Sequence, residues 1–206
     1  MSNKFEQGLE RYFSQPQLQK IRSVKIGIAG AGGLGSNCAM FLVRSGFCHF
    51  VIVDMDTVDA SNLNRQNYFL DQVDHHKVDA LAENLQRINP AVEVSVRNCR
   101  LSKENFDPVF QDCTILIEAF DKPDIKADFA EHFAGKGKFL VTASGLAGFG
   151  TGNRIVTRQV RPDFYVVGDE SNGIDTAPPL APAVTIAAAK EADVVLGYVL
   201  GGVSHE

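Results

Sequence analysis

The sequence predicts an α/β fold with a doubly wound, mainly parallel sheet, and three observations carry that prediction. Short apolar segments alternate with amphipathic segments from residue 24 to residue 144. A glycine-rich turn joins the first apolar segment to the first helix of this alternation. Acidic residues follow several apolar segments directly. Because right-handed crossovers bring the carboxyl ends of parallel strands to one edge, we expect a ligand site at that edge.

The expected strands are short apolar runs that end at glycine, charged or turn residues. They cover residues 24–30, 49–54, 92–97, 114–119 and 138–144. Apolar residues at helical spacing predict helices over 33–44, 76–88 and 122–133, and a polar helix over 5–20 that is interrupted near Pro16.

The pattern changes after Ser144. A glycine-rich stretch is followed by residues that include several β-branched ones. The segment FYVVGDE (Phe164–Glu170) predicts one more strand, antiparallel to the sheet. Residues 170–182 predict a mobile loop. An apolar helix follows from Val184 and should pack on the sheet. We therefore expect one domain over 1–206, with an N-terminal helical segment (1–22), a core (23–144), and an extension (145–206) of antiparallel strands, loop and C-terminal helix.

The composition excludes several classes of protein. The 206 residues are 45% apolar and 22% charged, and the net charge of −5 argues against a general nucleic-acid binder. The sequence contains no run of 18 apolar residues, so we expect no membrane span. The N-terminus lacks the apolar core of a signal peptide. The four cysteines form no C-x-x-C pair, so we expect reduced thiols in a cytoplasmic protein and no structural zinc.

The stretch GAGGLGS (Gly30–Ser36) contains G-x-G-x-x-G between an expected strand and helix. Gly30 permits the tight turn, Gly32 lets the backbone approach a phosphate, and Gly35 lets helix and strand pack closely. Gly33 adds another position without a side chain, and the helix N-terminus attracts an anion. Asp54 lies 24 residues after Gly30, where a ribose-binding acid is expected. We predict a Rossmann-like nucleotide site; the alternative is a glycine turn that only permits packing.

Three charged residues favour a reaction of ATP over hydride transfer. Arg65 and Lys77 could neutralise a triphosphate, and Asp121, after the fourth strand, could hold Mg²⁺. A dehydrogenase would also need a nicotinamide pocket and usually a substrate domain, for which little chain remains after the sheet.

Each of these side chains also has a purely structural interpretation. Arg65 could pair with Asp56 or Asp59, Lys77 could be solvated at a helix start, and Asp121 could cap the helix that begins near Lys122. For His75 and His76, a loop surface is favoured over a metal pair, because the sequence offers no third ligand.

The motifs GAGGLGS, DMDTVDASNLNRQ (Asp54–Gln66), RINP and the strand-four aspartate, with Lys77, resemble the ThiF/MoeB family, bacterial relatives of ubiquitin-activating enzymes. The resemblance covers roughly Arg11 to Ala143, and SNLNRQ discriminates far better than the glycine loop. The short length is similar to the compact second type of ThiF, an adenylyltransferase for the sulfur carrier ThiS.

The resemblance implies binding of Mg-ATP and of the C-terminal Gly-Gly tail of a small ubiquitin-like carrier. The tail carboxylate would attack the α-phosphate to give an acyl-adenylate and pyrophosphate. Gly33 would contact the nucleotide, Asp54 the ribose, and Asp121 Mg²⁺. The remaining nucleotide-binding positions would be Gly30, Gly32, Asp56, Asn62, Arg65, Gln66 and Lys77, of which Arg65 and Lys77, with Asp121, would be catalytic. Family members are usually homodimers.

The sequence departs from the family at three points. It lacks the two C-x-x-C pairs that bind zinc in larger relatives. Residues 145–206 contain no cysteine, so a separate protein would donate sulfur. Ser14 stands where relatives carry an arginine, with Arg11 and Arg22 as possible substitutes.

Four functions follow from this sequence. The leading one is adenylation of a ThiS-like carrier in thiamine (thiazole) biosynthesis. The alternatives are adenylation of another carrier or of a small-molecule or tRNA-linked carboxylate, a non-catalytic nucleotide-binding partner subunit, and, most weakly supported, an NAD-dependent oxidoreductase.

Overall fold

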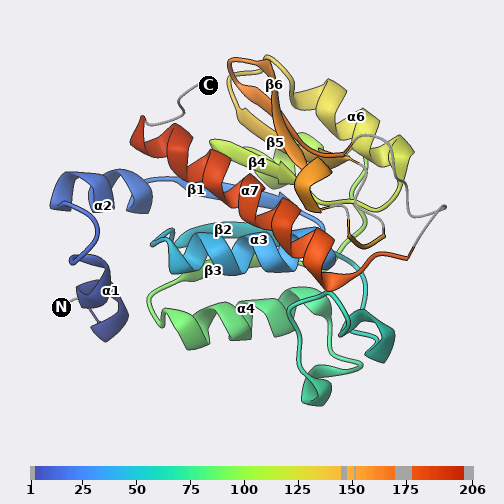
Figure 1. Cartoon of the computed structure of the whole chain (residues 1–206), viewed down its shortest axis with the longest axis horizontal. Coiled ribbons are helices and arrows are strands. Elements are labelled where there is room, and N and C mark those ends of the chain that lie inside the picture. Colours follow the sequence, from blue (N-terminus) through green and yellow to red (C-terminus); the bar gives the residue numbers. More distant parts are fainter. Residues whose placement is uncertain (1–2, 145–147, 151, 170–177, 202–206) are drawn as a thin grey trace.

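A computed structural model describes residues 3–144, 148–150, 152–169 and 178–201 of the chain. It contains one seven-stranded sheet with the strand order β3-β2-β1-β4-β5-β7-β6 (Figure 1). The strands are β1 (Lys25–Ala29), β2 (His49–Val53), β3 (Glu93–Arg97), β4 (Ile115–Glu118), β5 (Phe139–Ser144), β6 (Val156–Arg161) and β7 (Phe164–Gly168). All neighbours pair in parallel except β6 with β7. The expected Rossmann-like, mainly parallel fold is confirmed.

Helices cover both faces of this sheet. They are α1 (Lys4–Leu9), α2 (Gln15–Arg22), α3 (Gly33–Arg44), α4 (Lys77–Ile88), α5 (Phe106–Phe110), α6 (Pro123–Phe133) and α7 (Ala181–Leu200), with short 3₁₀ turns η1 (Ala60–Asn62), η2 (Leu70–Gln72) and η3 (Gly152–Arg154). Figure 1 shows α3 between α4 and α7, and the core residues of these three helices pack on one sheet face. The other face packs against α5 and α6, where Phe106, Phe110, Phe129 and Phe133 form edge-to-face ring contacts.

The N-terminal segment forms two helices rather than the single interrupted helix expected over 5–20. Asn3 caps α1, which ends at Leu9. Ser14 and Gln17 form a capping box at the start of α2, so Pro16 lies in the first helical turn. Proline is well tolerated there because the amide that it lacks would have no partner in the helix. Pro16 therefore helps to begin a helix instead of breaking one.

The extension after β5 corrects a second expectation. The strand expected to be antiparallel, β7, runs parallel to β5, with Leu140 opposite Phe164. The antiparallel strand is β6, because a tight turn at Pro162 and Asp163 reverses the chain between β6 and β7. Every residue of strand β6, at the sheet edge, is exposed. Most of the loop expected over 170–182 lies outside the described residues.

The strand topology decides where a ligand can bind. The order reverses between β1 and β4, since the chain leads from β1 outward to β3 and then returns to β4 on the other side. In doubly wound sheets the carboxyl ends of the strands at such a switch point form the binding crevice. The glycine loop follows β1, Asp54 follows β2, and Asp121 lies just past β4, so all three are at this edge.

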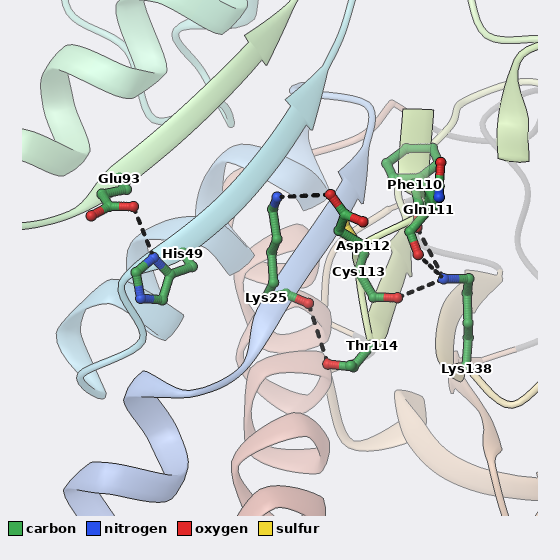
Figure 2. A network of polar contacts seen from close by, with 9 residues as sticks. All are labelled: Lys25, His49, Glu93, Phe110, Gln111, Asp112, Cys113, Thr114 and Lys138. Carbon is green, nitrogen blue, oxygen red and sulfur yellow. Dashed lines mark hydrogen bonds and ion pairs between the residues drawn. The ribbon is translucent and has the colours of Figure 1, made fainter. Parts of the chain in front are cut away.

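The opposite, amino edge of the sheet is held by its own polar contacts (Figure 2). His49 at the start of β2 contacts Glu93 at the start of β3, with a distance of 3.2 Å between Nδ1 and Oε2. Lys138, just before β5, donates from Nζ to the carbonyl oxygens of Phe110, Gln111 and Cys113 at 3.0, 3.1 and 2.7 Å. One ammonium group thus satisfies three carbonyls at the end of α5.

One acidic side chain of the core has no partner among the described residues. Glu191 on α7 is fully buried, and neither of its carboxylate oxygens accepts a hydrogen bond there. Burial, and secondarily the charge of Glu118, raises the pKa of Glu191 well above its usual value. No helix in the described part of the chain combines the length and apolar character needed to cross a membrane.

We predict that Lys138→Met lowers the free energy of unfolding by about 2 kcal/mol, because three carbonyls lose a charged donor. The measurement is urea denaturation. Lys25→Met is the control, since it removes only the exposed 3.7 Å pair with Asp112, which should contribute less than about 1 kcal/mol. Equal losses in the two variants would show that Lys138 has no special role at this edge.

Candidate active site

The glycine loop is built so that α3 approaches the sheet closely. Gly30 has a φ of +107°, and a Cβ atom there would lie 2.7 Å from the carbonyl oxygen of Ala119 in the loop after β4. At Gly35 a Cβ would lie 1.9 Å from the carbonyl oxygen of Gly30. No side chain fits at either position, so both glycines are required by the packing of β1, α3 and the β4–α6 loop.

Gly32 and Gly33 have a different environment. A Cβ on Gly32 would meet only the Gln66 side chain, at 3.8 Å, and both glycines are partly accessible. Gly33 begins α3, so the first amides of the helix lack partners within the helix. The atom of Gln66 that faces Gly32 is its amide nitrogen, which is a hydrogen-bond donor. This combination of open backbone, helix N-terminus and a nearby donor fits an anionic group such as a phosphate.

Asp54 is fixed against the glycine loop. Its Oδ2 accepts from the backbone N–H of Ala31 at 2.7 Å, and its Oδ1 accepts from the N–H of Asp56 at 2.8 Å. These bonds hold the carboxylate beside the turn, and its remaining lone pairs can accept hydrogen bonds from hydroxyl groups. The structure places Asp54 just after β2 and beside the glycine loop, and a ribose contact stays a prediction.

The SNLNRQ segment is anchored to α3. Asn37 donates from Nδ2 to the carbonyl oxygens of Gly33 at 2.6 Å and Arg65 at 2.8 Å. The aliphatic part of Arg65 consequently lies over Gly33, with its Cγ 3.6 Å from the position of a Cβ there. Asn62 belongs to the same segment, but its Oδ1 accepts from the N–H of Asp59 at 3.3 Å, so it closes a turn.

The guanidinium of Arg65 forms no ion pair within the described residues. It donates to the carbonyl oxygen of Ser61 at 3.3 Å and to Oδ1 of Asn64 at 2.7 Å, both neutral acceptors. The alternative pairing with Asp56 or Asp59 is thus not observed. Among the described residues, the Arg65 guanidinium thus has no acidic partner beside the N-terminus of α3. An anion bound there would interact with the guanidinium and with the partial positive charge of the helix.

Lys77 is buried, and its ammonium pairs with Asp56, with Nζ and Oδ2 separated by 2.9 Å. The interpretation of Lys77 as a solvated helix-start residue is therefore wrong. Asp56 is 56% exposed at its side chain, so the ion pair is open to solvent on one side. The two residues are 21 positions apart in the sequence, so no local pattern predicts the pair.

Tyr68 connects these parts and carried no sequence signal. Its hydroxyl lies 2.6 Å from the carbonyl oxygen of Ala31 in the glycine loop and 3.3 Å from that of Lys77. Burial, followed by the nearby charge of Asp54, raises the pKa of Tyr68 well above its usual value, so the hydroxyl keeps its proton. Tyr68 thereby fixes the distance between the glycine loop and the start of α4.

Asp121 lies in the loop between β4 and α6 and is exposed. The cap of α6 is Lys122, without a side-chain hydrogen bond, so the structure does not support a capping role for Asp121. Ala119, two residues earlier, donates to the carbonyl oxygen of Ala29 at 2.9 Å. This contact places the Asp121 loop beside the end of β1.

Two further groups considered from the sequence are Arg22 and the histidines that precede Lys77. Arg22 ends α2, just before the amino end of β1, and its guanidinium is 3.8 Å from Glu6. Within one chain, the length of β1 separates it from the glycine loop, so Arg22 does not replace the family arginine there. His75 and His76 are exposed, and among the described residues no three His, Cys, Asp or Glu side chains are placed to hold a metal ion.

Comparison with known proteins supports the assignment that this geometry suggests. Residues 6–199 match the ThiF family. The chain belongs to the ThiF family. It is 34% identical over 126 residues to the adenylyltransferase and sulfurtransferase UBA4 of Yarrowia lipolytica, covering 61% of this chain and 32% of that protein. With UBA4 of Aspergillus clavatus it shares 34% identity over 155 residues, covering 75% of this chain and 30% of the relative. The chain thus spans about a third of these relatives.

Solved structures show the same fold. The AMP complex of Escherichia coli tRNA N6-threonylcarbamoyladenosine dehydratase, TcdA, matches with a TM-score of 0.83 and 22% identity, over 95% of this chain and 93% of that chain. Escherichia coli MccB matches with a TM-score of 0.74 and 19% identity, over 96% of this chain and 64% of MccB. At these identities the likeness shows the fold alone.

The two types of glycine in the loop give a direct test of the packing. We predict that Gly35→Ala lowers the free energy of unfolding by about 1–3 kcal/mol, because the added methyl overlaps the Gly30 carbonyl. Gly32→Ala is the matched variant, because its methyl has room, and it should change stability far less. Chemical denaturation of both variants measures the difference, and equal stabilities would contradict the close approach of α3 to β1.

Proposed function

We propose that this ThiF-family chain is an ATP-dependent adenylyltransferase. Its substrate would be the C-terminal Gly-Gly carboxylate of a small ubiquitin-like sulfur carrier, similar to ThiS, in thiamine (thiazole) biosynthesis. The single observation that carries the proposal is the position of Arg65. Its stem lies over the N-terminus of α3 and its guanidinium contacts only neutral oxygens among the described residues. A phosphate group at the glycine loop would supply the missing charge partner.

In the proposed reaction a carboxylate oxygen of the carrier attacks the α-phosphorus of ATP. The new oxygen–phosphorus bond gives an acyl-adenylate, and the bond to the β-phosphate oxygen breaks to release pyrophosphate. A carboxylate is already a nucleophile, so no general base is required. The contribution of the chain would therefore be alignment of the two substrates and neutralisation of charge on the phosphates.

The site residues fit these tasks. Asp54 would accept the ribose hydroxyls, and the amides at Gly32 and Gly33 would bind phosphate oxygens. Arg65 would bind phosphate oxygens through its planar fork. Lys77, which Asp56 holds at 2.9 Å, would neutralise a further phosphate oxygen in competition with Asp56. The neutral amide of Gln66 would add a hydrogen bond beside Gly32.

Asp121 is the proposed protein ligand for Mg²⁺. Mg²⁺ commonly takes one or two carboxylates from the protein and the remaining ligands from phosphates and water. A single exposed carboxylate in the loop that touches the end of β1 fits this requirement. The metal would neutralise charge on the phosphates when bound.

The proposed partners follow from the same reasoning. The carrier tail would enter the carboxyl edge of the sheet as an extended chain. The proposed source of the sulfur is a separate donor protein. A homodimer would cover part of the apolar helix α7, where Tyr198 is 49% exposed.

A second candidate substrate is a small-molecule or tRNA-linked carboxylate. It is favoured by the likeness of the fold to TcdA, a tRNA N6-threonylcarbamoyladenosine dehydratase by name, whose AMP complex this chain matches with a TM-score of 0.83. The two substrates require the same nucleotide site and differ only in the acceptor.

ATP–pyrophosphate exchange tests the proposed function. We predict exchange that depends on a Gly-Gly-ended carrier and that Arg65→Ala reduces about 100- to 1,000-fold, since a donor to the developing charge is lost. The melting temperature should change little. Arg87→Ala, which removes a guanidinium 5.6 Å from the Phe69 ring and away from the glycine loop, is the control and should retain exchange.

The outcomes separate the alternatives. Exchange with a tRNA-linked or small carboxylate, but with no carrier, would favour the second substrate. ATP binding by calorimetry without exchange for any acceptor would identify a non-catalytic nucleotide-binding subunit. Exchange that Arg65→Ala leaves unchanged would contradict the role of this arginine.

A further inference from the structure

A partly buried ion pair contacts the loop that carries Asp121. Glu118, the last residue of β4, is fully buried, and its Oε1 is 2.8 Å from Nζ of Lys126 on α6. The same Oε1 accepts from the backbone N–H of Phe120 at 2.7 Å. Lys126 also donates to the carbonyl oxygen of Phe120 at 3.1 Å. The two side chains therefore hold both polar groups of one residue's backbone.

This backbone unit lies between the two parts of the candidate site. Ala119 precedes it, and the Ala119 carbonyl oxygen is the atom that a Cβ on Gly30 would approach to 2.7 Å. Asp121 follows it directly. A shift of the Phe120 peptide would consequently move Asp121 relative to the glycine loop.

Two features of this location disfavour the charged forms of Lys126 and Glu118. Lys126 lies near the N-terminus of α6, where the helix dipole disfavours a cation. Burial raises the pKa of Glu118, while Lys126 and the Phe120 amide oppose that shift. A buried ion pair is weak support for stability, because desolvation offsets much of its attraction. Its contacts with Phe120 give it a different role, which is to fix the geometry of the loop.

We propose that Glu118 and Lys126 are positioning residues that hold the Phe120 peptide, and thereby keep Asp121 in place to bind Mg²⁺ beside the glycine loop. This inference rests on the proposed function. Neither residue would touch the nucleotide. Their effect would act through the loop backbone, as second-layer partners of metal ligands do.

The test uses Lys126→Met in the full chain, with two readouts. The first is amide hydrogen exchange of Phe120 without ligand, measured by NMR, which should become at least about tenfold faster because the pair no longer orders the loop. The second is the Mg²⁺ concentration that half-saturates ATP binding, which should rise about 10- to 100-fold. ATP affinity without Mg²⁺ should stay within about threefold of wild type, because Lys126 does not contact the nucleotide.

Two variants control for general damage. Lys126→Arg keeps a charged donor and should restore both readouts to near the wild-type values. Lys103→Met removes the exposed 2.8 Å pair with Asp128 on the same helix and should change neither readout. Should Lys126→Met fail to fold because Glu118 is left buried without a partner, the double variant Glu118→Gln/Lys126→Met removes both charges and should show the same increase in the Mg²⁺ requirement.

The results distinguish this inference from the proposed function. If wild type binds Mg-ATP and Lys126→Met keeps the wild-type Mg²⁺ requirement, the positioning role is wrong and the proposed function survives. Unchanged Phe120 exchange in the variant also overturns the positioning role. If wild type binds no ATP with or without Mg²⁺, the proposed function fails first, and the inference fails with it.

Discussion

The candidate site depends on one close contact, the approach of the first turn of α3 to the end of β1. A Cβ on Gly35 would lie 1.9 Å from the Gly30 carbonyl oxygen, so only glycine permits this approach. Because α3 is held so near the sheet, its unpaired N-terminal amides face the carboxyl edge at the switch point. Gly30 in turn lies against Ala119, which joins the β4–α6 loop to the same contact.

The charged groups around this contact differ in how they are neutralised. Lys77 already has Asp56 as a partner, whereas Arg65 contacts only neutral oxygens among the described residues. An incoming phosphate would therefore gain most from Arg65 and from the helix amides, and would have to compete for Lys77. This difference is the physical reason for assigning the largest effect on the reaction to Arg65.

The sheet core and the glycine loop could be predicted from the sequence, because both depend on local patterns. Apolar runs identified β1, β2, β4 and β5, and the spacing of Gly30, Gly32 and Gly35 identified the turn. It did not predict α5, which is only five residues long, or the direction of β7, which depends on the distant partner β5. The sequence also did not predict the contacts of four further residues, Tyr68, Asn37, Glu118 and Lys126. Their roles come from contacts between segments that are distant along the chain or in different elements, and no local pattern records such contacts.

Binding of the ATP phosphates at the N-terminus of α3 is tested most directly by amide chemical-shift changes in the wild-type chain, recorded on separate addition of Mg-ATP and NADH. We predict that Mg-ATP shifts the amides of Gly32, Gly33 and Leu34, leaves those of Lys25 and His49 at the opposite edge unchanged, and that NADH shifts none of them. Two results would contradict this binding site. One is a shift of the α3 amides with NADH but not with Mg-ATP, and the other is no shift of these amides with either compound.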